Sequence, residues 1–152
     1  MSQTDHDLCI QVLEEYVSEA PQLRLIEKHY GGEQGPNFLA EDTEKGCLIY
    51  VEVELDAKDA KKAKRHAKKA LELFRKHQKP VYVWVVASSE KWAYSRDKTG
   101  IGDYIQKLKK DEEVYFMGRI SPLTLGAYAP NLINKTQQLL TTPRNRQNSH
   151  TK

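Results

Sequence analysis

The alternation of apolar and polar positions predicts a strand near the middle of the chain, over residues 47–55. Successive side chains of a strand point to opposite faces, so Tyr50, Glu52 and Glu54 share one face and the apolar residues between them share the other. Two neighbouring carboxylates in a partly buried sheet are unfavourable unless a positive group holds them. Lys58 or a divalent cation could do so. The alternative is an edge strand whose polar residues face solvent.

Hydrophobic periodicity predicts the other elements. Apolar residues recur every three or four positions in two long segments, and alanines dominate the second of them. We expect Asp5 to cap the first helix and Asp103 to cap a later, shorter one. In chain order the pattern predicts helix 6–19, strands 23–30, 36–41 and 47–55, helix 57–77, strand 81–87, helix 103–110, strand 113–120 and a terminal helix near 132–140.

The order of these elements predicts an α/β fold with a restriction endonuclease-like αβββαβ core. Residues 42–46 have the composition of a hairpin turn, so the second and third strands should pair antiparallel. A crossover helix then leads to the β-prone run 81–87, which implies a mixed central sheet flanked by helices. We expect a single domain over residues 1–141 and a polar, basic, disordered tail over residues 142–152.

Charge is concentrated on the second long helix, although the net charge of the chain is only +3. Between residues 58 and 76 the acidic residues are only Asp59 and Glu72, and the basic ones are far more numerous. A concentrated positive field suits a polyanion, and a simple solvated face is the alternative. The candidate nucleic-acid-binding residues are Lys61, Lys62, Arg65, Lys68 and Lys69.

The cysteines and the N-terminus bear on the compartment. Cys9 and Cys47 are far apart in sequence and are interpreted as buried free thiols in a reducing environment. No apolar run approaches bilayer length, and the first residues lack a basic-then-apolar signal. We therefore expect a cytoplasmic protein that does not contact a membrane.

The segment 91–102 mixes aromatic and basic residues, which permits two interpretations. This segment could contact nucleic acid, because bases stack on aromatic rings and basic groups follow phosphates; its residues of these kinds are Trp92, Tyr94, Arg96 and Lys98. We favour the alternative, in which Trp92 packs against the core. The histidines have no spacing typical of a zinc site and are interpreted as ordinary surface or strand-end residues: His6, His29, His66, His77 and His150.

Two carboxylates on one strand and a nearby lysine favour phosphodiester chemistry. Mg²⁺ and Mn²⁺ prefer hard oxygen ligands, and they keep positions for water and phosphate oxygens. A metal at Glu52 and Glu54 could activate water, while Lys58 could stabilise the charge that develops on the phosphate.

The element order and these residues resemble the PD-(D/E)xK nuclease superfamily over roughly residues 5–87, and within it the replication-relaxation-type proteins of mobile elements. The resemblance implies that Pro36-Asn37 stands where the superfamily has Pro-Asp, that Glu52 is the metal-binding acid and that Glu54 stands at the usual lysine position. Lys58 would then be a migrated lysine. Additional acids could come from Glu14 or Glu15 on the first helix, or from Glu41 or Asp42 on the second strand.

Asn37 departs from this pattern, because an amide oxygen is a poorer Mg²⁺ ligand than a carboxylate. Three hypotheses follow. The first is a Mg²⁺- or Mn²⁺-dependent DNA endonuclease that acts in replication, mobilisation or repair of a mobile element. The second is a non-catalytic DNA-binding or regulatory domain with a degenerate site. The third is a protein-interaction or inhibitor module. DNA is the expected partner, and a homodimer is a further option.

Overall fold

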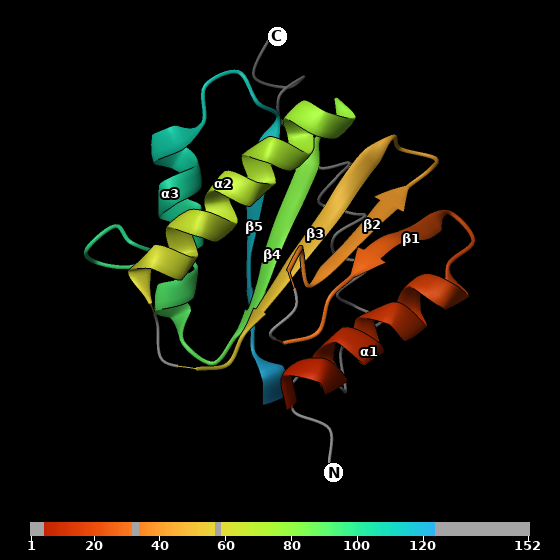
Figure 1. Ribbon diagram of the computed structural model, residues 1–152, viewed down its shortest axis with the longest axis horizontal. Helices are drawn as coiled ribbons and strands as arrows, with labels where there is room; N and C mark the ends of the chain where they lie inside the picture. Colours follow the sequence, from red (N-terminus) through yellow and green to blue (C-terminus); the bar gives the residue numbers. More distant parts are fainter. Residues whose placement is uncertain (1–4, 32–33, 57–58, 124–152) are drawn as a thin grey trace, which may run out of the picture.

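The computed structural model describes residues 5–31, 34–56 and 59–123, whose helices and strands follow the predicted order (Figure 1). The elements are α1 (Asp5–Glu19), β1 (Leu23–Lys28), β2 (Phe38–Asp42), β3 (Cys47–Glu54), α2 (Ala60–His77), β4 (Val81–Ala87), the 3-10 helix η1 (Glu90–Trp92), α3 (Ile101–Leu108) and β5 (Val114–Ile120). Lys58, the predicted terminal helix and the predicted tail lie outside the described residues.

The strands form one mixed sheet in the order β1-β2-β3-β4-β5. β1, β2 and β3 pair antiparallel, whereas β4 runs parallel to both β3 and β5. β3 lies in the middle, with Phe38 opposite Val51 on one side and Val85 beside Glu52 on the other. The αβββαβ core and the hairpin are therefore confirmed. The alternative of an edge strand for β3 is wrong, because both of its edges are hydrogen-bonded to neighbours.

The first half of the core lies between α1 and one face of the sheet. Ile10 and Leu13 of α1 have no exposed surface and belong to the same cluster as Ile49, Val51 and Val53. Those three residues are the apolar face predicted from the alternation in β3. Both cysteines are buried here, as expected from the sequence.

The second half of the core lies under α2 and α3, which pack side by side on the other face (Figure 1). The inner face of α2 consists of Ala63, Ala67 and Ala70, each without exposed surface. Small side chains let a helix axis approach a sheet closely. Trp92 is also fully buried in this cluster, so the interpretation that it packs against the core is confirmed.

The helix starts differ slightly from the predictions. Asp59 caps α2, because its side chain accepts a hydrogen bond from the backbone N–H of Lys61 at 2.9 Å. α3 begins at Ile101, and Asp103 lies inside its first turn rather than at the cap. There its carboxylate accepts the backbone N–H groups of Ser95 and Gly100. Likewise, Asp5 is the first residue of α1.

Among the helices of the described ranges, none is both long enough and apolar enough to cross a bilayer.

Candidate nucleic-acid interface and carboxylate site

Three parallel stripes of side chains on α2 organise the candidate site. Residues at i, i+4 and i+7 lie along one face of a helix, and a shift of one residue rotates the stripe by about 100°. The alanine stripe packs on the sheet, and the next stripe is Lys62, His66 and Lys69, all half-buried. The outermost stripe is Lys61, Arg65 and Lys68, all exposed.

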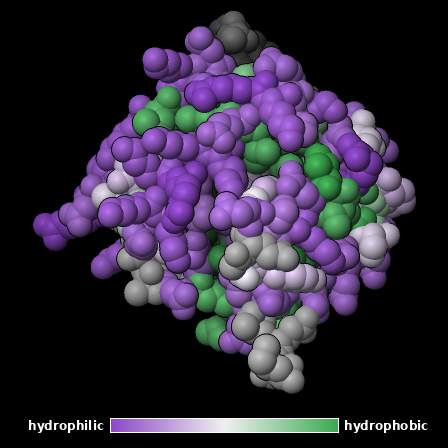
Figure 2. All heavy atoms as spheres, in the orientation of Figure 1, coloured by the Kyte–Doolittle hydropathy of each residue, from purple (hydrophilic) through white to green (hydrophobic). Residues whose placement is uncertain are grey.

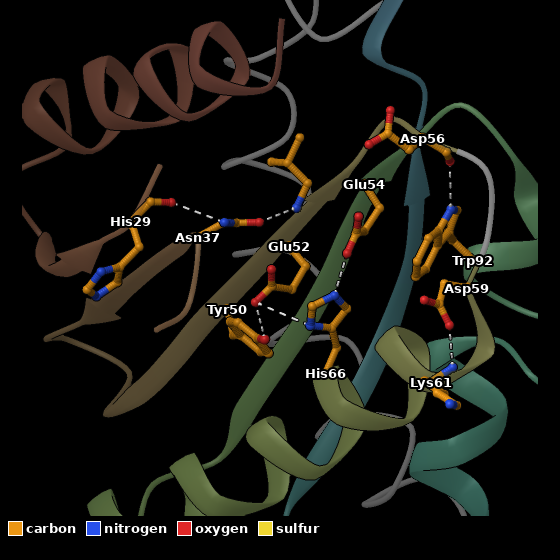
Figure 3. A network of polar contacts seen from close by, with 11 residues as sticks. His29, Asn37, Tyr50, Glu52, Glu54, Asp56, Asp59, Lys61, His66 and Trp92 are labelled. Atoms are coloured by element: carbon orange, nitrogen blue, oxygen red, sulfur yellow. Dashed lines mark hydrogen bonds and ion pairs between the residues drawn. The ribbon is translucent and has the colours of Figure 1, made fainter. Parts of the chain in front are cut away.

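His66 meets both carboxylates of β3 (Figure 3). Its Nε2 donates to Oε2 of Glu54 at 2.6 Å, and its Nδ1 lies 3.8 Å from Oε2 of Glu52. Glu52 and Glu54 point to the α2 side, as the strand alternation predicts, and the imidazole lies between them. Trp92 lies beside the imidazole, with the two ring centroids 6.3 Å apart.

Glu52 is a buried acid with 3% of its surface exposed. The hydroxyl of Tyr50 donates a hydrogen bond to its Oε2. Burial raises the pKa of Glu52, and Glu54 adds to this, while His66, the Tyr50 hydrogen bond and Lys69 oppose it. The pKa of the Tyr50 hydroxyl is also raised well above its ordinary value, chiefly by burial. Tyr50 therefore remains a donor at neutral pH.

Asn37 uses its side-chain amide to join two stretches of backbone. Its Nδ2 donates to the carbonyl of His29 at 3.0 Å, and its Oδ1 accepts the backbone N–H of Val53 at 2.9 Å. A carboxylate could not make the first of these bonds, because it has no N–H to donate. The structure therefore places the Asn37 amide beside Val53, the residue between Glu52 and Glu54 on β3, with its oxygen already bonded.

The other acids considered from the sequence lie elsewhere. Glu14 pairs with Lys28 on the α1 side of the sheet, and Glu15 is on the same helix. Glu41 pairs with Arg24 and Lys79, and it stands opposite Leu48. Since Leu48 is four residues before Glu52 on β3, Glu41 is about 13 Å along the strand from that acid. Neither Glu14 nor Glu41 is brought to the carboxylate pair. Asp42, at the end of β2, caps the hairpin turn through Glu44 and Lys45.

A divalent cation does not fit the carboxylate pair in this arrangement. Mg²⁺ and Mn²⁺ need oxygens that are free to bind and room for several waters. The side chains of Glu52, Glu54 and His66 are only 4%, 12% and 13% exposed, and their facing atoms are engaged with one another or with Tyr50. Within residues 5–31, 34–56 and 59–123, no group of three or more His, Cys, Asp or Glu side chains is arranged to hold a metal ion.

The outer side of α2 is a different kind of surface. Hydrophilic side chains cover much of the face shown in Figure 2, in the orientation in which α2 crosses the front of the sheet. Lys61, Arg65 and Lys68 are exposed there, and Lys64 is exposed beside them. Of the five candidate nucleic-acid-binding residues, Lys61, Arg65 and Lys68 are exposed, whereas Lys62 and Lys69 are half-buried. Lys69 also lowers the pKa of Glu52 electrostatically. We name Lys61, Arg65 and Lys68 the outer basic stripe.

His66 is the residue that the sequence interpretation missed, since it was treated as an ordinary surface residue. A helix that connects two parallel strands runs back over the strand that precedes it, so its first turns lie above the end of that strand. A polar residue one position before the inner alanine Ala67 is then directed to the flank of the helix, toward Glu52 and Glu54. The position of His66 beside the alanine stripe was therefore the available signal.

Comparison with known proteins gives limited similarity. No family model matches the chain, and no curated protein matches it. Among solved structures, "The structure of Pyrococcus Furiosus SfsA in complex with Ca2+" is similar with a TM-score of 0.43 and 17% sequence identity, over 77% of this chain and 56% of that chain. The chain thus corresponds to just over half the length of that protein.

Proposed function

We propose that this chain binds nucleic acid through the outer basic stripe of α2. The observation that carries the proposal is that Lys61, Arg65 and Lys68 are all exposed on one helix face. Their spacing lets three cations meet successive phosphates of a backbone, and phosphate contacts supply most sequence-independent affinity.

The surroundings of the stripe support a binding role that does not depend on a metal. Glu52 and Glu54 are covered by the helix and lie beside His66, so they do not neutralise the outer stripe. Asp59 caps the start of α2, and Glu112 pairs with Arg75 in its last turn. Glu72 is the one acidic residue within α2, a full turn beyond Lys68.

The test is the salt dependence of DNA binding, measured by fluorescence anisotropy with a labelled duplex and a labelled single strand. The wild-type chain should bind with an affinity that falls steeply as salt rises. Arg65→Gln should make the negative slope of log K against log salt less steep by about 1. The variant in which Lys61, Arg65 and Lys68 are all replaced by Gln should make it less steep by about 3.

The matched control is Lys45→Gln, which removes one positive charge from the β2–β3 hairpin, outside α2. It should leave the slope unchanged. An equal effect of Lys45→Gln and Arg65→Gln would mean that only net charge matters, and it would reject the assignment of the stripe. Absence of binding to either probe at low salt would reject the function itself.

A second candidate function is a Mg²⁺- or Mn²⁺-dependent DNA endonuclease, of the kind that acts on mobile elements. The observation that favours it is that Glu52 and Glu54 project side by side from the end of a central strand. Because the His66 imidazole lies between these two acids, a metal would have to displace it, so nicked or linear DNA after incubation of supercoiled plasmid with either metal would support this function and contradict exclusion of the metal by His66. Glu52→Ala should abolish the cleavage, whereas Glu44→Ala, at an exposed hairpin position, should not.

A further inference from the structure

The side chain of His66 occupies the space between two carboxylates that would otherwise repel each other. Glu52 and Glu54 are neighbours on one face of β3, and the two ring nitrogens of His66 face one carboxylate each, at 3.8 Å and 2.6 Å. An ionised Glu54 carboxylate can only accept, so in that state Nε2 donates the hydrogen bond to its Oε2. The imidazole therefore stands where a cation shared by the two acids would stand.

The surroundings hold the imidazole in this place. Trp92, which is fully buried, lies on one side of the ring, and its indole N–H points to the backbone carbonyl of Asp56. Ala67, the next residue of α2, is fixed against the sheet. Tyr50 engages the same oxygen of Glu52 that faces His66. Rotation of the ring out of the site would therefore leave a cavity beneath α2 and would remove the hydrogen bond from His66 to Glu54.

We propose that His66 acts as an internal occupant that excludes divalent cations from the Glu52–Glu54 pair. A bound Mn²⁺ or Mg²⁺ would need carboxylate oxygens at about 2.0–2.2 Å and several waters, and the imidazole fills that volume. Removal of the imidazole converts the pair into a site with two hard oxygen donors and room for water. This inference does not depend on nucleic-acid binding by the outer basic stripe.

The test measures Mn²⁺ binding to the full chain without nucleic acid, by isothermal titration calorimetry and by the loss of the free Mn²⁺ signal in electron paramagnetic resonance. His66→Ala should bind one Mn²⁺ at least about tenfold more tightly than the wild-type chain, which corresponds to one unit in log K. The control is His66→Ala combined with Glu52→Gln and Glu54→Gln, in which the gained binding should be lost.

Three results would overturn the proposal: wild-type binding as tight as that of His66→Ala, no binding by folded His66→Ala, or binding that survives in the combined variant.

Circular dichroism identifies whether each variant folds. If His66→Ala does not fold, His66→Asn replaces it, because this side chain is smaller than imidazole and retains N–H donors. A gain of thermal stability with added Mn²⁺ in that variant, and none in the wild type, is then the expected result. An equal shift in both proteins, or none in the variant, would contradict the proposal. DNA binding is measured separately, so either result stands without the other.

Discussion

The side-chain oxygen of Asn37 accepts the backbone N–H of Val53, 16 residues further along the chain, at 2.9 Å. The nitrogen of the same amide donates to the carbonyl of His29. A residue that stands at the start of β2 thus fixes the end of β3, from which Glu52 and Glu54 project. In sequence Asn37 resembles a weakened metal ligand, and in the structure its amide holds strands together.

Asn37→Asp should therefore destabilise the chain by about 1–3 kcal/mol instead of restoring a metal ligand, because the carbonyl of His29 loses its donor and a charge is placed at a buried position. Urea unfolding followed by circular dichroism measures the change. Gln106→Glu, the same amide-to-acid change at an exposed position of α3, should alter the free energy of unfolding by less than about 0.5 kcal/mol. Equal stability of Asn37→Asp and the wild type would show that the amide bridge is dispensable.

Ala67→Leu should destabilise the chain by about 1–3 kcal/mol, because the alanine has no exposed surface and a larger side chain would push α2 away from the sheet. Ala60→Leu makes the same change at an exposed position of the same helix and should be close to neutral. Thermal unfolding of both variants measures the difference. Similar melting temperatures for the two would mean that α2 does not pack as closely as described.

Gly102→Ala should also be destabilising, since an added Cβ would lie 2.6 Å from the ring of Tyr94 and 2.8 Å from the ring of Phe116. The two rings pack edge to face, so neither can move without loss of that contact. We expect a cost of about 1–3 kcal/mol. At Gly31 an added Cβ would meet only ordinary contacts, at 3.7 Å or more, so Gly31→Ala serves as the control. A cost at Gly102 no larger than that at Gly31 would contradict the expected clash.

The ion pair between Arg75 and Glu112 should make stability depend on acid pH. Backbone N–H groups, chiefly that of Lys110, and the Arg75 guanidinium lower the pKa of Glu112 from 4.5 to about 2. A lowered pKa in the folded state stabilises the fold above the unfolded-state value, and this contribution is lost as the pH falls from 4.5 toward about 2.

Arg75→Gln should reduce this pH dependence and lower stability at neutral pH by about 0.5–1 kcal/mol, a modest loss because the Arg75 side chain is 58% exposed. Denaturant unfolding between about pH 2 and pH 7 measures both effects. Arg96→Gln, at an exposed loop position, should leave the profile unchanged. A parallel pH profile for Arg75→Gln and the wild type would exclude a role of the guanidinium in the pKa of Glu112.

The fold could be predicted from the sequence because periodicity decides which faces are buried. The alternation in β3 and the alanine spacing in α2 each specify a face, and the hairpin at residues 42–46 specifies the pairing of β2 with β3. The predicted start of α3 was less accurate. Aspartate is a common helix cap, but Asp103 lies inside the first turn and accepts the backbone N–H groups of Gly100 and Ser95. This contact depends on the conformation of the preceding loop, which the sequence pattern does not specify.

The candidate site was less predictable because its contacts join residues that are far apart in sequence. The partner of Glu54 is His66 on the following helix, and the partners of Glu41 are Arg24 and Lys79. The pairing of Glu54 with His66 depends on how α2 is placed over β3. Spacing along the chain indicates the face on which a side chain lies and leaves open the residue that meets it.

The three stripes of α2 place packing residues, the partner of the carboxylates and exposed cations on different faces of one helix. Substitutions along the outer basic stripe do not touch the alanines that hold the helix to the sheet, so the charge of that surface can change sign or disappear while the fold is retained. The flank that carries His66 is different, because that side chain is paired with Glu54 and packed beside Trp92. Divergent copies of this chain can therefore change the charge of the outer basic stripe at a few positions, at little cost to foldability.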